Sequence, residues 1–279
     1  MIALADSAFR RISSLALAEA GLDLQEGKQP FVASRLQKRL RATGTEDFDA
    51  YATLVEGQGQ IAEQERQHLI SALTTNVTSL FREMHHFSLL AKVLVANDRG
   101  PLEPLRIWSA GCSSGEETLS IAMICRTIFG RNWIDRARIL ATDIDYATLS
   151  GAVHQANSKD TTAALRTGAA QALGENREVP RISVTELQAG ITYLRHSLID
   201  PLPTTRRFDI IFCRNVTIYF APKIQYSVQS SLLSQLNPNG LLCLGHSERL
   251  LVEGSNMMLV GPTSYAGKTA SFRENKQCR

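Results

Sequence analysis

The stretch LRIWSAGCSSGEE, residues 105–117, decides the fold that we expect for this chain. Its apolar start, 105–108, predicts a buried strand, and a helical pattern opens at Glu116 after a run of small residues. A small-residue loop between a strand and a helix is typical of a nucleoside-binding edge, because ligands bind beyond the carboxyl ends of parallel strands. Gly111 and Gly115 would let the backbone approach such a ligand. An ordinary turn between strand and helix would fit the same pattern.

The charge of this loop narrows the choice of ligand. No G-x-G-x-x-G pattern follows the strand, which disfavours a dinucleotide, and two carboxylates, Glu116 and Glu117, stand where a pyrophosphate would bind. A ligand that carries positive charge suits a loop of this kind. Glu117 could reach an amino group of that ligand, or it could only offset the dipole of its helix.

Composition excludes several classes of protein. The chain has 279 residues, 44% of them hydrophobic, and a formal net charge of +3, so a sizeable core is expected and a general nucleic-acid or membrane coat is not. No apolar run is long enough to span a bilayer, and the N-terminal residues lack the pattern of an export signal. The five cysteines are widely spaced without a C-x-x-C pair, so we expect neither disulfides nor a metal site. A cytoplasmic location follows.

Residues 1–96 are predicted to form a helical N-terminal domain, because apolar residues recur there at helical spacing. Gly21 and Gly44 are expected to end the first two helices, and Asp47 to begin the third. The second helix, expected over 31–42, carries four cations and no acid on one side; this side could be a solvated face or a docking surface for an acidic partner helix. The four cations are Arg35, Lys38, Arg39 and Arg41.

A polar run, TTNVTSLFRE at 74–83, lies between the last two helices of this domain. Thr78 or Ser79 is expected to cap the helix that follows. His85 and His86 are expected to be surface or capping side chains, because adjacent residues diverge on a helix and cannot easily share a metal.

After a linker at 97–104, strands and helices alternate through residues 105–279, which predicts a parallel sheet. The stretch 157–190 has no aromatic residue, and either a loose helix or a short insertion would fit it. Strands are expected at 105–109, 137–142, 191–194, 208–213 and 240–245, helices at 116–129, 146–156 and 222–236, and an edge hairpin from 258–260 and 264–271.

Polar residues follow two of these strands at the edge where a ligand would bind. Asp143 ends the second strand, so its carboxylate could accept hydrogen bonds from both hydroxyls of a ribose. It could instead cap the next helix, a role that Asp145 could also take. Arg214 and Asn215 end the fourth strand. Together with the glycine loop, these residues favour an adenosine-type ligand.

Several motifs resemble the CheR family of chemotaxis receptor glutamate O-methyltransferases. The resemblance covers nearly the whole chain, in the order of the family, and TTN-x-T-x-x-FRE and FCRNV-x-IYF are specific to it. It implies an α/β fold, a class I (Rossmann-like) methyltransferase sheet with a helical N-terminal domain. The matching stretches are TTNVTSLFRE at 74–83, IWSAGCSSGEE at 107–117, ATDID at 141–145, FDIIFCRNVTIYF at 208–220 and LNPNGLLCLGHSE at 236–248.

The resemblance also implies a reaction and its partners. S-adenosylmethionine would be the cofactor and S-adenosylhomocysteine the product, with glutamate side chains on the cytoplasmic helices of chemoreceptors becoming methyl esters. A glutamate is already ionised at neutral pH, so no general base is needed, and orientation alone can supply roughly 7–11 kcal/mol. We expect a monomer that neither binds nucleic acid nor inserts into a membrane.

Site residues follow from the resemblance by position. Arg82 and Tyr219 are the candidate catalytic residues, because they would position the substrate carboxylate. The basic helix resembles the receptor-docking helix of the family. The candidate cofactor-binding residues are Asn76, Thr78, Arg82, Gly111, Glu117, Asp143, Ser197, Leu198, Arg214 and Asn215.

The chain departs from the family pattern at several places. Thr118 and Leu119 replace Pro and Tyr, Ser197 stands where the family has a cofactor-contacting Asn, and 157–190 lacks the aromatic segment and small β-subdomain of the family. A cofactor-binding regulatory or interaction module with weak or no turnover is therefore the alternative function. The glycine pattern and the acidic loop disfavour an NAD-dependent dehydrogenase, and the lack of a broad basic surface disfavours a nucleic-acid methyltransferase.

Overall fold

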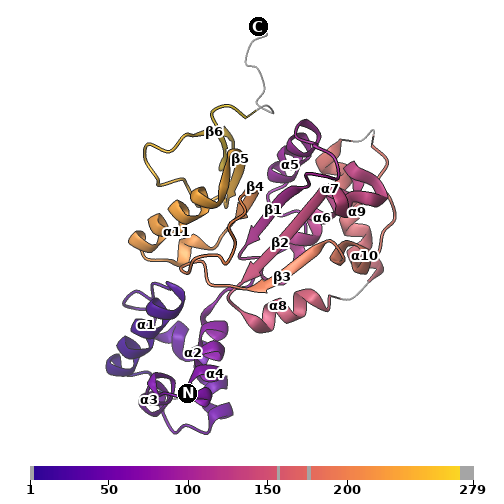
Figure 1. The fold of residues 1–279 in the computed structure, drawn as a ribbon. Coiled ribbons are helices and arrows are strands. Elements are labelled where there is room, and N and C mark those ends of the chain that lie inside the picture. The colour runs from indigo at the N-terminus through magenta and orange to yellow at the C-terminus, as the bar shows by residue number, and fades with distance from the viewer. Residues whose placement is uncertain (1–2, 156–157, 175–176, 271–279) are drawn as a thin grey trace.

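A seven-stranded sheet organises the computed structural model, which describes residues 3–155, 158–174 and 177–270 (Figure 1). The strand order is β3-β2-β1-β4-β5-β7-β6; β1 to β5 run parallel, and β7 pairs antiparallel with β5 and β6. The expected parallel sheet and edge hairpin are confirmed. The strands are β1 (Leu105–Ala110), β2 (Ala137–Asp143), β3 (Ile191–Arg195), β4 (Phe208–Cys213), β5 (Leu236–Leu244), β6 (Met257–Gly261) and β7 (Ser264–Gly267).

Helices cover both faces of this sheet. Because side chains alternate along a strand, Ile107 of β1 packs into one buried cluster and Trp108 into the other. The first cluster includes residues of α5, α6, α9 and α10, and the second includes residues of α1 to α4 and α11. The helices are α1 (Asp6–Ala20), α2 (Gln29–Thr43), α3 (Phe48–Glu56), α4 (Gln60–Leu73), α5 (His85–Ala96), α6 (Glu116–Phe129), α7 (Trp133–Arg136), α8 (Tyr146–Val153), α9 (Lys159–Leu173), α10 (Val184–Gln188) and α11 (Pro222–Gln235), with single 3-10 turns η1 (Gly130–Asn132) and η2 (Thr217–Tyr219).

The helices α1 to α4 form a group of their own beside the sheet (Figure 1). Their ends follow the expectation: Gly21 and Gly44 close α1 and α2 in the left-handed region, with φ of 71° and 69°, and the Asp47 side chain caps α3 by accepting from Ala50 N. Leu22, just after α1, forms an antiparallel bridge with Phe220. The chain between α1 and α2 therefore touches the segment that follows β4.

The segment between α4 and α5 differs from its prediction. Residues 74–84 form an irregular loop, α5 begins only at His85, and no side chain caps it, so the predicted cap by Thr78 or Ser79 is wrong. His86 is fully buried rather than at the surface. Helix α5 packs against α6 and α9, in the buried cluster that includes Ile107 of the sheet. The division of the chain after residue 96 stays a prediction, and the packing of α5 favours an earlier boundary.

The weakly patterned stretch after α8 holds two helices, α9 and α10, and the described residues 177–183 between them are irregular. Helix α9 packs on α6 through small residues, and its buried positions are Leu165, Gly168, Ala169 and Ala172. Helix α8 ends at Val153, before the expected end at Ala156, which lies outside the described residues, as do Ser271 and Cys278. Among the described helices, none has the length and apolar character needed to cross a bilayer.

Candidate functional site

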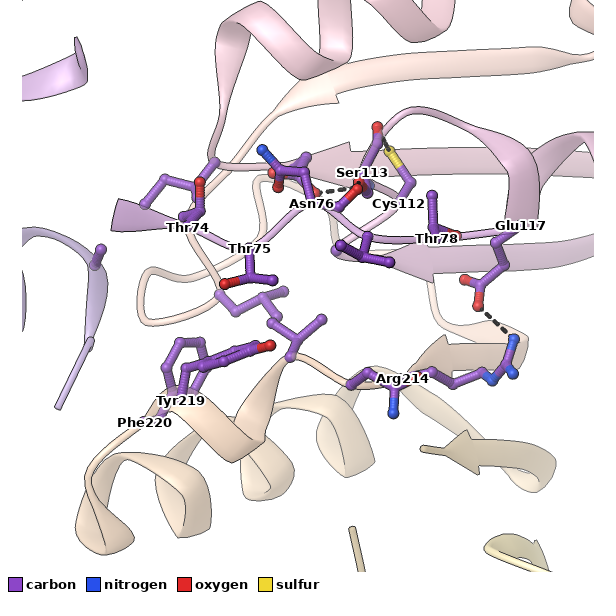
Figure 2. Close-up of a pocket in the computed structure, with 18 of the residues that line it drawn as sticks. Thr74, Thr75, Asn76, Thr78, Cys112, Ser113, Glu117, Arg214, Tyr219 and Phe220 are labelled. Atoms are coloured by element: carbon purple, nitrogen blue, oxygen red, sulfur yellow. Dashed lines mark hydrogen bonds and ion pairs between the residues drawn. The ribbon is translucent and has the colours of Figure 1, made fainter. Parts of the chain in front are cut away.

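A pocket opens at the carboxyl edge of the sheet, where β1 and β4 lie side by side although other strands separate them in the sequence (Figure 2). It holds about 910 Å³ of space, part of it open to solvent. A switch between neighbouring strands of this kind is where parallel sheets bind ligands. The pocket brings together every cofactor and catalytic candidate: Asn76, Thr78, Arg82, Gly111, Glu117, Asp143, Ser197, Leu198, Arg214, Asn215 and Tyr219.

The glycine loop is held in place by the end of β2. Gly111 N and Cys112 N both donate to Thr142 O, at 2.8 and 2.9 Å. Gly111 has φ of +83°, and a Cβ there would lie 2.4 Å from Val216 Cγ2, so both its conformation and its surroundings require glycine. Burial raises the pKa of the Cys112 thiol well above its ordinary value, so this pocket residue stays a protonated thiol.

Asp143 joins the glycine loop to the end of β2. Its Oδ2 accepts from Ser113 N at 2.8 Å and its Oδ1 from Asp145 N at 2.9 Å. Burial raises its pKa above the ordinary value, and these hydrogen bonds work in the opposite direction. The role of helix cap belongs to Asp145, whose Oδ1 accepts from Ala147 N and Thr148 N at the start of α8. The carboxylate of Asp143 is thus free of capping and lines the pocket.

The loop 74–84 reaches over the pocket from the end of α4 (Figure 2). The side-chain amide of Asn76 donates to Asp145 Oδ2 at 2.7 Å and to Thr148 Oγ1 at 2.8 Å. The main-chain carbonyl of Asn76 accepts from Ser113 Oγ at 3.1 Å. Arg82 lines the pocket and donates one hydrogen bond, from Nη1 to the carbonyl of Val77 at 3.0 Å. These bonds tie the loop to α8 and to the glycine loop.

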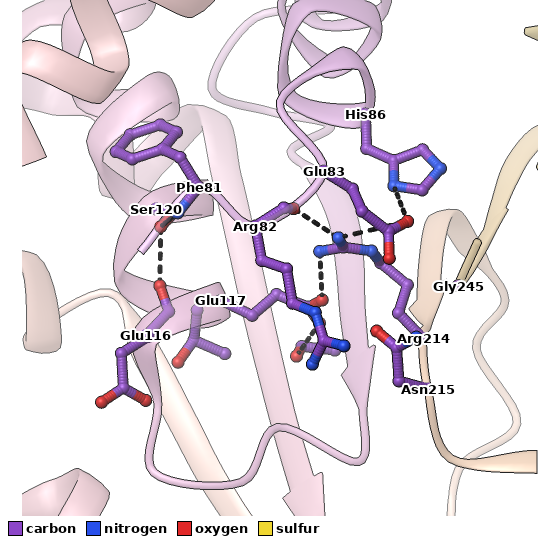
Figure 3. Close-up of polar contacts among 12 residues, drawn as sticks. Phe81, Arg82, Glu83, His86, Glu116, Glu117, Ser120, Arg214, Asn215 and Gly245 are labelled. Atoms are coloured by element: carbon purple, nitrogen blue, oxygen red, sulfur yellow. Dashed lines mark hydrogen bonds and ion pairs between the residues drawn. The ribbon is translucent and has the colours of Figure 1, made fainter. Parts of the chain in front are cut away.

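Arg214 lines the pocket and lies between two carboxylates (Figure 3). Its Nη1 donates to Glu117 Oε2 at 2.9 Å, and its Nη2 donates to the Arg82 carbonyl and lies 3.5 Å from Glu83 Oε2. The side chain of Arg214 is only 3% exposed. Glu117 is equally engaged, because its Oε1 accepts from Ser109 Oγ at 2.6 Å. Both residues therefore hold the site together as well as lining it.

Tyr219 stands on the opposite wall, on the 3-10 turn η2 after β4. Its side chain lines the pocket, and its carbonyl accepts from Asp23 N at 2.8 Å, so the chain after α1 supports this wall. The sequence prediction missed this contribution because Ala20 and Leu22 belong to no motif. Most other missed residues are neighbours of motif residues. The pocket residues outside the prediction are Ala20, Leu22, Thr74, Thr75, Val77, Cys112, Ser113, Ile144, His196, Val216 and Phe220.

The four cations of α2 are not equivalent. Arg35, Lys38 and Arg41 are exposed, and none of the four lines the pocket. Arg39 differs, because its guanidinium donates to both oxygens of Glu65, at 2.9 and 2.6 Å, and Glu65 is only 5% exposed. The hydroxyl of Tyr51 donates to the same carboxylate at 2.8 Å. Arg39 is therefore part of the packing of α2 on α4 rather than a free surface cation.

His85 and His86 lie closer together than expected. Their ring centroids are 4.1 Å apart, and one ring nitrogen of each lies within 4.8 Å of the other and of a carboxylate oxygen of Glu83. Burial, followed by Arg214 and His85, lowers the pKa of His86 to about 3, so its ring is neutral. The guanidinium of Arg214, 3.5 Å from Glu83 Oε2, already supplies a positive charge at this position.

Comparison with known proteins gives two family matches that together cover most of the chain. A family model described as "CheR methyltransferase, SAM binding domain" matches residues 76–265, and one described as "CheR methyltransferase, all-alpha domain" matches residues 7–74. The chain is 36% identical to the chemotaxis protein methyltransferase of Escherichia coli K12, over 95% of this chain and 92% of that one. It is 34% identical to chemotaxis protein methyltransferase 2 of Pseudomonas aeruginosa, over 88% of each chain.

A likeness to a solved structure is much more distant. Magnesium protoporphyrin IX methyltransferase from Synechocystis, solved with bound SAM, superposes with a TM-score of 0.38 at 14% identity, over 85% of this chain and 97% of that one.

Proposed function

This chain belongs to the CheR methyltransferase family, and on that premise we propose that it transfers the methyl group of S-adenosylmethionine to glutamate side chains on the cytoplasmic helices of chemoreceptors. The products are glutamyl methyl esters and S-adenosylhomocysteine. The observation that supports this proposal most is the meeting, in one pocket, of motif residues from the loop 74–84, the glycine loop and the ends of β2 and β4.

The residues of the pocket fit this cofactor, which supplies a methyl group on a positively charged sulfur. The bare backbone at Gly111 leaves room that a Cβ would fill. The carboxylate of Asp143 is placed at the end of β2, where an acid can accept from the two hydroxyls of a ribose. Glu117, whose carboxylate pairs with Arg214, lines the same pocket, and we assign it to the cofactor-binding surface with Asn76, Thr78, Ser197, Leu198 and Asn215.

Arg82 and Tyr219 are the catalytic residues that we assign. The substrate glutamate is ionised at neutral pH, so the protein needs to orient it rather than to remove a proton. The Arg82 guanidinium carries five N–H donors, and its hydrogen bond to Val77 O uses one of them. The remaining donors can align a carboxylate as a fork, while Tyr219 can donate from the opposite wall.

The exposed cations of α2 are the docking residues in this proposal. Arg35, Lys38 and Arg41 present positive charge on one helix, which suits the acidic surface of a receptor helix. Arg39 is excluded from this surface by its pairing with Glu65. The protein would act in the cytoplasm as a monomer.

Radiolabelled methyl transfer from S-adenosylmethionine to a panel of receptor cytoplasmic fragments tests the proposal. We expect label on receptor glutamates, its loss in Arg82→Ala, and retained turnover in Arg131→Ala, a matched change at an exposed arginine outside the pocket. Saturating S-adenosylhomocysteine should raise the melting temperature of the wild-type protein and of Arg82→Ala, because a ligand that binds the native state stabilises it. Binding without turnover on any fragment would favour the alternative, a regulatory module.

A further inference from the structure

A buried carboxylate stands behind the wall of the pocket that β4 provides. Glu248, in the turn after β5, is 6% exposed and does not line the pocket. Its Oε1 accepts from Val216 N at 3.1 Å, and from both Thr217 N and Thr217 Oγ1 at 2.8 Å. Its Oε2 accepts from Asn215 N and Gly245 N, each at 2.7 Å. One carboxylate therefore binds three successive main-chain amides of the segment that follows Arg214.

These contacts hold a conformation that the chain would otherwise resist. Asn215 has φ of +59°, in the left-handed region, which costs most residues with a side chain about 1–2 kcal/mol and asparagine less. Three amides in a row also have to find acceptors away from water, since an unpaired buried N–H is costly. A carboxylate accepts only, so it can serve all of them at once. An amide side chain at position 248 would turn a donor toward at least one of these N–H groups.

The clamped segment sets the geometry of the pocket on this side. Arg214, Asn215 and Val216 all line the pocket, and Tyr219 follows within the same turn. Val216 Cγ2 is also the atom against which a Cβ at Gly111 would collide, so Val216 fixes how closely the glycine loop and the end of β4 approach each other. A shift of this segment would change the width of the pocket.

We propose that Glu248 is a positioning residue of the methyl-transfer site, which holds Asn215, Val216 and Tyr219 in their binding arrangement through the main chain. The inference rests on the proposed function, because it assigns Glu248 to the same pocket. It predicts that loss of the carboxylate impairs cofactor binding by protein that is still folded. A residue that only stabilised the fold would lower the melting temperature and leave the affinity of the folded molecules unchanged.

Titration calorimetry with S-adenosylhomocysteine, well below the melting temperature of each variant, tests this. We expect Glu248→Gln to weaken binding at least about tenfold and to raise KM for S-adenosylmethionine. Glu253→Gln, a matched change at an exposed acid nearby, should bind as the wild type does. Binding by folded Glu248→Gln within about twofold of wild type would overturn the inference.

A second variant, Gly245→Ala, tests the same inference if Glu248→Gln does not fold. A Cβ at Gly245 would lie 2.5 Å from Asn215 Nδ2, 2.6 Å from Asn215 N and 2.7 Å from Glu248 Oε2, so Gly245→Ala pushes Asn215 and Glu248 apart without changing any charge. Gly245 is not among the glycines with positive φ, so its backbone accepts alanine. We expect weaker binding here too, and wild-type affinity would overturn the inference. Failure of the wild-type protein to bind would instead refute the proposed function.

Discussion

Gly168→Ala should destabilise the protein, although the same change in the middle of a helix normally stabilises it. Gly168 lies inside α9, and a Cβ there would meet the ring of Phe81 at 2.1 Å from Cδ2 and 2.6 Å from both Cγ and Cε2. Phe81 is 6% exposed, has φ of +53°, and its amide donates to Ser120 Oγ at 3.0 Å. The ring therefore cannot withdraw without moving the loop that carries Arg82.

Two opposing contributions decide whether Gly168→Ala raises or lowers the free energy of unfolding. Alanine in place of glycine in a helix interior gains about 1 kcal/mol. Forcing an extra methyl group into a packed core costs about 1–3 kcal/mol. Gly151 of α8 offers a matched control, because a Cβ there meets no atom within 4 Å. Gly151→Ala keeps only the first contribution, so the two variants should differ by about 1–3 kcal/mol in unfolding free energy.

Urea unfolding at constant temperature measures this difference directly, provided that the slope with denaturant stays the same. Methyl transfer gives a second measurement, because displacement of Phe81 moves the adjacent Arg82. We expect turnover to fall in Gly168→Ala and to stay unchanged in Gly151→Ala. Equal stabilisation of both variants would show that α9 leaves room for the methyl group, and the account of how Phe81 fixes the loop would then be wrong.

Three further predictions concern charge and pH. Lys38→Glu should reduce receptor methylation while changing the free energy of unfolding by no more than about 0.5 kcal/mol. Arg39→Glu should instead lower the free energy of unfolding, measured in urea, by about 3 kcal/mol, because Glu65 loses its partner. Asp143→Asn should weaken the binding of S-adenosylhomocysteine about tenfold in calorimetry, since an asparagine side chain has one oxygen and can accept only one of the two main-chain hydrogen bonds. Burial keeps the pKa of His86 at about 3, below the value near 6.5 of the unfolded chain. The contribution of His86 to the free energy of unfolding is therefore fully present above about pH 6.5, and it falls on acidification by at most about 1.4 kcal/mol per pH unit. His86→Gln should flatten this dependence of the unfolding free energy on pH.

The sheet and its ligand edge were predictable because local sequence decides them. Helix α6 has the predicted bounds, since Gly115 and Gly130 flank a run with helical spacing of apolar residues. Asp145 could be predicted as a cap because an acid before a helix start has a local partner. Asp143, Arg214 and Asn215 were predictable as pocket residues because the ends of parallel strands meet at one edge of a sheet, whereas the residues of the loop 74–84 followed from the family resemblance.

The rest depends on contacts between distant parts of the chain. Three of the four buried positions of helix α9 are glycine or alanine, so its sequence has few of the large apolar residues by which a helix is usually found. Arg39 looks like Lys38 in the sequence, and only Glu65, on another helix, distinguishes them. Glu248 stands in a recognised motif, but its role depends on amides that lie some thirty residues earlier.

The position of Arg214 affects how variants of this site are to be interpreted. Its guanidinium lies between Glu117 and Glu83 and bonds the carbonyl of Arg82, so it joins α6, the end of β4 and the loop 74–84 (Figure 3). Removing this charge leaves two carboxylates, at 11% and 12% side-chain exposure, without their cation, and breaking a buried pair costs about 3–5 kcal/mol. Loss of activity in Arg214→Ala could therefore come from a displaced loop 74–84 as readily as from a lost cofactor contact. Arg82→Ala leaves the cluster around Arg214 intact, because Arg82 contributes only its main-chain carbonyl to it.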